Sequence, residues 1–186
     1  MKWEVFKVDD GKVLTHFKRM EDADAFIAAF DGTNLGQGAL QLREVNAAAI
    51  ARPILRIVRG QPGSGKSTFA SKHFPGVFHI ENDMFLVSGG EYKWSKERVK
   101  EAISLCTKMA RTALANGSDV VVANTFTKCR FIQFYKNLAN EYGAEFEVYR
   151  CHGDFKNVHG LSDKMVENFK NAMEDWPGEV DVWPNM

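Results

Sequence analysis

The chain carries no excess of either charge. Lysine and arginine together number 24, as do aspartate and glutamate, so the formal net charge is +0. A neutral chain lacks the broad basic field that drives non-specific nucleic-acid binding, although a local basic channel is compatible with this balance. The charge therefore disfavours a module that only binds DNA or RNA. It says little against an enzyme that acts on the end of a strand.

Cysteines are few, and long apolar runs are absent. Cys106, Cys129 and Cys151 have neither disulfide-framework nor zinc-ligand spacing, and are typical of reduced thiols in a cytosolic protein. The first six residues, MKWEVF, do not resemble a secretory signal, because no apolar stretch follows a basic start. No run is long enough to span a membrane. We therefore expect a cytoplasmic protein, and its 45% hydrophobic residues indicate a folded core.

Residues 1–51 are predicted to form a small N-terminal cap of ββα or ββαβ type. Apolar alternation and helical spacing define its elements, and Asp10-Gly11 suits a tight hairpin turn. The expected elements are strands over 3–8, 13–17 and 40–45, and a helix over 21–30. The Ala-rich residues 46–51 read as a connector. We have no functional expectation for this segment.

Residues 52–186 alternate strands with helices, which predicts βαβ units and a parallel sheet flanked by helices. The fold class expected is therefore α/β. The expected strands are 54–58, 77–80, 120–123 and a run from 146 to about 151. The expected helices are 66–73, one capped by Ser95 and ending near Gly117, one over 131–142 and one over 162–175. Pro177-Gly178 ends the last helix, and the tail after it is expected to be loose.

A phosphate-binding loop lies between the first of these strands and the helix that follows it. The pattern G-x-x-x-x-G-K-[ST] is complete in Gly60, Gln61, Pro62, Gly63, Ser64, Gly65, Lys66 and Ser67. Glycines allow successive backbone N–H groups to face phosphate oxygens, and the helix adds its positive end. Lys66 can reach the β- and γ-phosphates, and the Ser67 hydroxyl can ligate Mg²⁺. The sequence thus predicts a P-loop NTPase fold that binds ATP and Mg²⁺.

The stretch Arg59–Thr68 resembles the nucleotide loop of polynucleotide-kinase-like P-loop kinases, which include zeta-toxin-like ATP-binding kinases. The resemblance runs from about Ile54 to Pro177 and adds Thr68 to the nucleotide-binding residues. In this family an acidic residue after the second strand lies beside the acceptor hydroxyl. Asp83 occupies that position here, and the resemblance implies that it is the general base. Capping a helix, or binding Mg²⁺ through water, is the alternative role for Asp83.

Two further motifs of the family have counterparts. Gly90–Trp94 resembles its gly-x-tyr-x-trp/phe segment, and Val120–Thr125 matches its central strand. The family strand ends in a carboxylate, whereas this chain has Asn124, which is a weaker cation ligand and could simply cap the strand. Ser67 would then carry more of the Mg²⁺ coordination.

The stretch 156–160, KNVHG, resembles the family lid, which places a cation over the transferred phosphate. Lys156 holds that position and Arg150 is a second candidate, although both could be solvated surface charges. Lys128 and Arg130 follow Asn124 at the expected mouth of the site. With Phe126 and Phe131 nearby they could bind the acceptor's phosphate and stack a base, or they could be surface charges beside core aromatics.

These observations predict a kinase that moves the γ-phosphate of ATP to a hydroxyl. The resemblance favours the 5′-hydroxyl of a nucleic acid, such as a single-stranded end. A small-molecule kinase acting on a nucleoside, sugar or nucleotide-sugar is the first alternative. A nucleotide-dependent binding or inhibitor protein without turnover is the second, and Asn124 in place of a carboxylate motivates it.

Overall fold

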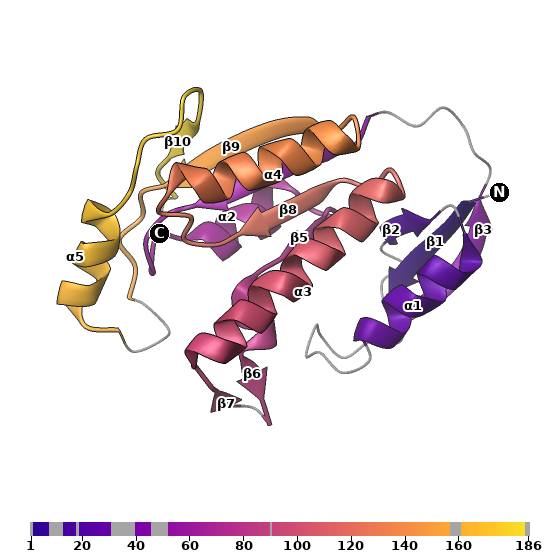
Figure 1. Cartoon of the computed structure of the whole chain (residues 1–186), viewed down its shortest axis with the longest axis horizontal. Helices are drawn as coiled ribbons and strands as arrows, with labels where there is room; N and C mark the ends of the chain where they lie inside the picture. The colour runs from indigo at the N-terminus through magenta and orange to yellow at the C-terminus, as the bar shows by residue number, and fades with distance from the viewer. Residues whose placement is uncertain are drawn as a thin grey trace. The chain divides into compact units, whose positions relative to one another are not determined.

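The structure is a computed structural model that describes residues 2–7, 13–17, 19–30, 40–45, 52–89, 91–156 and 161–184 (Figure 1). The chain divides into two units. Unit 1 comprises residues 1–53 and 76–120, and unit 2 comprises residues 54–75 and 121–186. The predicted boundary near residue 51 lies outside the described residues, so it stays a prediction. No helix of the described residues is long and apolar enough to cross a membrane.

The N-terminal part of unit 1 is a three-stranded antiparallel sheet with one helix. The strand order is β2-β1-β3, and the register pairs Trp3 with Phe17 and Lys2 with Val45. The elements are β1 (Lys2–Lys7), β2 (Val13–Phe17), α1 (Met20–Phe30) and β3 (Leu40–Val45). Phe17 and Phe26 are buried with their ring centroids 5.1 Å apart, which attaches the helix to the sheet. The predicted ββαβ order is confirmed, whereas the predicted Asp10-Gly11 turn lies outside the described residues.

The rest of unit 1 centres on a long helix. Its elements are β5 (Phe78–Ile80), the 3₁₀ helix η1 (Asn82–Phe85), β6 (Val87–Ser88), β7 (Glu91–Tyr92) and α3 (Lys96–Ala115). Ser95 caps α3 as predicted, because its hydroxyl accepts a hydrogen bond from the Arg98 N–H at 3.2 Å. The helix buries Ala102, Cys106, Ala110, Ala113 and Leu114. The sequence did not predict the β6–β7 hairpin.

Unit 2 contains a parallel sheet flanked by helices, which confirms the predicted fold class. Its strands are β4 (Ile54–Arg59), β9 (Glu145–Cys151), β10 (Val180–Val182) and most of β8 (Val120–Ala123), in a sheet of order β10-β9-β4-β8-β5. Strand β9 runs parallel to β4 and to β10, and pairs Arg150 with both Arg59 and Asp181. Its helices are α2 (Lys66–His73), α4 (Cys129–Glu141) and α5 (Asp163–Asn171). Strand β4 delivers the chain directly into the phosphate loop.

Two sequence expectations for unit 2 were wrong. The tail after Gly178 is not loose, because Val180–Val182 pair with β9 as the edge strand β10. A three-residue edge strand with two outward-facing residues leaves too short an apolar pattern to predict. Helix α5 ends at Asn171, four residues before the predicted end. Residues 172–179 instead form a turn that packs on the ends of β4 and β9 through buried ion pairs described below.

Candidate functional site: a phosphate loop and a tyrosine-bound carboxylate

The loop between β4 and α2 has the backbone that the sequence pattern predicts. Gly60 has φ 149° and Gly65 has φ 85°, values in the left-handed region that favours glycine. A Cβ at Gly60 would lie 2.5 Å from the Cys151 carbonyl oxygen, and one at Gly65 would lie 2.9 Å from the Phe155 ring. Both positions therefore exclude a side chain on steric as well as conformational grounds. Gly65 is also the N-cap of α2 and offers no side-chain cap, so the first N–H groups of α2 have no side-chain acceptor from the cap residue.

Hydrogen bonds close the loop on itself. The Ser64 N–H donates to the Gln61 carbonyl at 3.1 Å. The Lys66 ammonium donates to the same carbonyl at 2.9 Å, which places the lysine at the loop. The Ser64 hydroxyl is fully buried and has no hydrogen-bond partner among the described residues. A turn rich in positive-φ glycine at a helix N-terminus, with a lysine beside it, has the donor set that a phosphate chain requires.

The segment that follows β9 forms hydrogen bonds with the loop. The Gln61 side-chain amide donates to the Gly153 carbonyl at 3.0 Å. The Gly153 N–H donates to the Ser64 carbonyl at 3.2 Å, and the Phe155 N–H donates to the Gly63 carbonyl at 2.8 Å. Three hydrogen bonds thus tie residues 153–155 to the loop. The next residue, Lys156, is exposed, and the rest of the predicted lid, 157–160, lies outside the described residues.

A buried charge cluster lies at the ends of β4 and β9. The Arg59 side chain is 0% exposed, and it donates to Glu179 at 3.1 Å and to the Glu174 carbonyl at 2.7 Å. Arg150 bonds to the same Glu179 at 3.3 Å and to Asp175 at 2.7 Å. Burial lowers the pKa of Arg59, and the charge of Glu179 opposes that shift. The Arg150 guanidinium therefore stabilises the 172–179 turn through two ion pairs, and this structural role explains its position.

The predicted general base lies in unit 1. Asp83 is half-buried in η1, and the Tyr92 hydroxyl donates to its Oδ1 atom at 2.9 Å. Burial, and then the charge of Asp83, raise the pKa of Tyr92, so this hydroxyl keeps its proton at neutral pH. The sequence did not predict this bond, because a tyrosine nine residues away in a polar stretch carries no periodic signal. Asp83 belongs to unit 1, whereas the phosphate loop belongs to unit 2.

The three predicted acceptor-side residues of unit 2 lie at the start of α4 and just before it. The Asn124 N–H donates to the Val58 carbonyl at 3.1 Å, which continues the sheet past β8. The Lys128 ammonium lies 3.1 Å from Glu174, and the Arg130 guanidinium stacks 4.9 Å from the Phe131 ring centroid. The structure thus gives Lys128 and Arg130 local partners. Groups of three or more metal-ligating side chains are absent from the described residues, and Ser67 is exposed at the start of α2.

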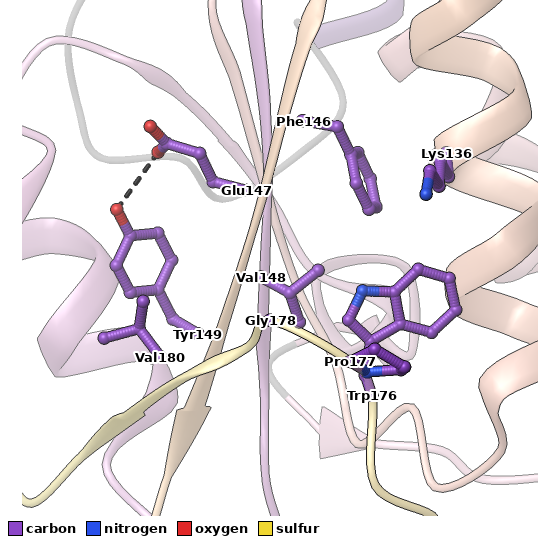
Figure 2. Close-up of a pocket in the computed structure, with 9 residues that line it drawn as sticks. All are labelled: Lys136, Phe146, Glu147, Val148, Tyr149, Trp176, Pro177, Gly178 and Val180. Atoms are coloured by element: carbon purple, nitrogen blue, oxygen red, sulfur yellow. Dashed lines mark hydrogen bonds between the residues drawn. The ribbon is translucent and has the colours of Figure 1, made fainter.

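A hollow in unit 2 lies beside β9 and has a volume of about 310 Å³ (Figure 2). Phe146, Lys136 and Trp176 lie on one side of β9 in this view, and Glu147 and Tyr149 lie on the other, as strand alternation requires. The Tyr149 hydroxyl donates to Glu147 at 3.0 Å. This hollow contains none of the predicted site residues.

An aromatic stack beside the loop was also not predicted from the sequence. Trp183 is 67% exposed and stacks on His152, with ring centroids 5.0 Å apart. Pro184, the next residue, lies 3.2 Å from where a Cβ of Gly65 would stand. These residues follow β10, so the missed strand and the missed stack have the same cause. The pairing of a short edge strand cannot be predicted from local pattern.

Comparison with known proteins defines the class. The profile of the AAA domain family matches residues 55–157, more than half of the chain, so the chain belongs to the AAA domain family. An uncharacterized protein of Pasteurella multocida (strain Pm70) is 33% identical in an alignment of 144 residues, with coverage of 69% of this chain and 80% of that protein.

The chain also resembles solved structures in its fold. A candidate kinase of Chloroflexus aurantiacus J-10-fl has a TM-score of 0.52 at 18% identity, over 72% of this chain and 89% of that chain. A chain of the Pnkp1/Rnl/Hen1 complex has a TM-score of 0.48 at 22% identity, over 67% of this chain, and this chain spans 40% of its length. The first of these likenesses, at 18% identity, shows the fold alone, which is an α/β fold with a parallel sheet flanked by helices.

Proposed function

We propose that this protein is an ATP-dependent kinase that transfers the γ-phosphate to a hydroxyl, with the 5′-hydroxyl of a nucleic acid as the favoured acceptor. The observation that carries the proposal is the phosphate loop. Its glycine conformations, its closure by the Gln61 carbonyl and the placement of Lys66 at that carbonyl suit a nucleotide triphosphate. Membership of the AAA domain family supports nucleotide binding by the same residues.

Each residue of the loop has a role in this proposal. Backbone N–H groups of the loop and of the first turn of α2, other than those of Pro62 (which has none) and Ser64, bind the phosphate oxygens, and Lys66 neutralises charge on the β- and γ-phosphates. Ser67 is the residue that would ligate Mg²⁺, which would neutralise the developing charge on the transferred group. Phosphoryl transfer depends mainly on such positioning and charge stabilisation, so a rigid loop is the principal catalytic element. The three hydrogen bonds from residues 153–155 supply that rigidity.

Asp83 is proposed as the general base. It accepts the proton of the acceptor hydroxyl while that oxygen forms a bond to the γ-phosphorus, and the bond from the γ-phosphorus to the bridging oxygen of ADP breaks. The resemblance in sequence order supports this role. On the acceptor side we propose Asn124, Lys128 and Arg130, which lie at the C-terminal end of a sheet strand and the start of α4. Ligands commonly bind at this edge of an α/β sheet.

Of the two predicted lid cations, Lys156 is the better candidate for the transferred phosphate. Its side chain is exposed, and it follows directly after the segment that is tied to the loop. Arg150 has its guanidinium bonded to Asp175 and Glu179, and would have to break two ion pairs to act. We therefore assign the phosphate contact to Lys156.

The test is transfer of labelled γ-phosphate from MgATP to a short 5′-hydroxyl oligonucleotide, offered as DNA and as RNA. Asp83→Asn should retain MgATP binding and lose transfer by about 100-fold or more, the range that general-base catalysis supplies. Asp24→Asn, an exposed aspartate of α1, is the matched control and should transfer at the parental rate.

The acceptor panel separates the alternatives. Label on a nucleoside or sugar, and none on the oligonucleotide, would support the small-molecule kinase that the neutral charge allows. MgATP binding without transfer to any acceptor would contradict the kinase proposal and support the binding protein. An Asp83→Asn variant with transfer within a few-fold of the parent would remove Asp83 from the mechanism.

A further inference from the structure

The chain reverses direction directly after the helix that carries Asp83. The hairpin formed by β6 and β7 pairs Val87 with Tyr92, and the Lys93 N–H donates to the Leu86 carbonyl at 2.8 Å. This reversal brings Tyr92 back over η1, nine residues along the chain from Asp83. The hairpin is too short to have a core of its own, with two residues in each strand, so its fold alone does not explain this placement.

The backbone of Asp83 is fixed independently of Tyr92. Within η1, the Leu86 N–H donates to the Asp83 carbonyl at 3.1 Å and the Met84 N–H donates to the Glu81 carbonyl at 3.3 Å. Helix α3 adds a hydrogen bond from the Arg98 guanidinium to the Phe85 carbonyl at 3.3 Å. The position of the Asp83 Cα is therefore set by η1 and α3. The rotation of its carboxylate depends in addition on side-chain hydrogen bonds, because the terminal torsion of an aspartate has a broad, roughly two-fold preference.

The Tyr92 hydroxyl can define that rotation. It donates to Oδ1 at 2.9 Å, a short bond to a charged acceptor, which is the stronger class of hydrogen bond. Burial and the neighbouring carboxylate raise the pKa of Tyr92, so the hydroxyl acts as a donor throughout the neutral range. Tyrosine is suited to this role because its ring is rigid and has few torsions to order. The side chain is still 40% exposed, so it contributes little to the core.

We infer that Tyr92 is a positioning residue, which holds the carboxylate of Asp83 in the orientation that accepts the proton of the incoming hydroxyl. This inference rests on the proposed function, because it requires Asp83 to be the base. Tyr92 touches neither the nucleotide nor the transferred phosphate in this account, and it acts through Asp83 alone. A base that lacks the hydrogen bond from Tyr92 would be in the productive orientation for a smaller fraction of the time, which lowers kcat and leaves nucleotide binding unchanged.

A double-mutant cycle tests the inference. The four proteins are the parent, Tyr92→Phe, Asp83→Asn and the double variant, assayed with MgATP and a 5′-hydroxyl oligonucleotide, and for phosphate release to water. Tyr92→Phe should lower kcat about tenfold with the KM for MgATP unchanged, as expected for one lost hydrogen bond to a charged group. In the Asp83→Asn background the same change should have no further effect, because Tyr92 then has no base to orient.

Tyr149→Phe is the matched control. This substitution also removes a tyrosine hydroxyl that donates to a carboxylate, that of Glu147 at 3.0 Å, but Tyr149 lies on β9 in unit 2. It should transfer phosphate at the parental rate. MgATP affinity, measured by calorimetry on each variant, reports that the protein is folded.

The outcomes separate the inference from the proposed function. A large loss in Asp83→Asn with a parental rate in Tyr92→Phe would overturn the positioning role and leave Asp83 as the base. Equal losses from Tyr92→Phe in both backgrounds would overturn it too, because Tyr92 would then act independently. A parental rate in Asp83→Asn, or no turnover by the parent, would overturn the proposed function and the inference with it.

Discussion

Glu179→Gln should destabilise the protein far more than its position in a short C-terminal turn suggests. Glu179 is 8% exposed and bonds to two guanidiniums, that of Arg59 at 3.1 Å and that of Arg150 at 3.3 Å. Glutamine keeps the size and one acceptor oxygen, but leaves the fully buried Arg59 charge without its carboxylate. Removing one partner of a buried ion pair costs about 3 to 5 kcal/mol of unfolding free energy. Because glutamine retains one acceptor oxygen, we expect a loss of about 3 kcal/mol, at the low end of this range.

Urea unfolding measures this loss. With an m-value of about 2 kcal/mol/M, a loss of about 3 kcal/mol lowers the midpoint by about 1.5 M. Asp175→Asn is the control, because Asp175 bonds to the same Arg150 at 2.7 Å but is 93% exposed. An exposed pair contributes about 1 kcal/mol at most, so the control should move the midpoint by less than about 0.5 M. Equal shifts for the two variants would refute the claim that burial decides the strength of this cluster.

Two further predictions concern the loop and the thiols. Gly65→Ala should weaken MgATP binding at least tenfold by calorimetry, because φ at Gly65 is 85° and a Cβ would lie 2.9 Å from the Phe155 ring. Gly143→Ala is the control: φ at Gly143 is a similar 65°, but a Cβ there would meet no atom within 4 Å, so this variant should bind MgATP normally. Burial raises the pKa of Cys151 to about 11 and that of Cys106 to about 12, from an ordinary thiol pKa of 9.0. Above pH 9 both thiols should therefore ionise in the unfolded chain while they stay protonated in the folded protein. Stability should therefore be constant below about pH 9 and fall as the pH rises toward 11, and a flat urea midpoint across that range would contradict the burial of these thiols.

The strand, the glycine-rich loop and the helix around Gly60–Ser67 could be predicted because their information is local. Spacing alone identified Gly60 to Ser67, and the apolar run before it and the helix after it were both observed, the helix as Lys66–His73. The central strand Val120–Ala123 was predicted for a related reason: it is buried at every position, so its whole pattern is apolar.

The parts that escaped prediction depend on residues far apart in the chain. The buried pair of Arg59 and Glu179 joins residues 120 positions apart, and an arginine at the end of an apolar strand gives no sign of its partner. The contacts of Gly153 and Phe155 with the loop are backbone hydrogen bonds, which the side-chain pattern does not record. The Phe131 ring, for which a place in the core was one of two interpretations, is 44% exposed, because Ile132, Tyr135 and Leu138 lie on the buried face of α4.

The most direct test of the account measures MgATP binding and γ-phosphate turnover in the parent, Lys66→Ala and Lys72→Ala. Both lysines lie in α2, but Lys66 contacts the loop carbonyl of Gln61 at 2.9 Å, and Lys72 is exposed in the last turn. We predict that Lys66→Ala abolishes turnover and leaves the unfolding midpoint unchanged. Lys72→Ala should bind MgATP and turn it over as the parent does. Turnover by Lys66→Ala at the parental rate would contradict the assignment of residues 60–67 as the catalytic phosphate loop.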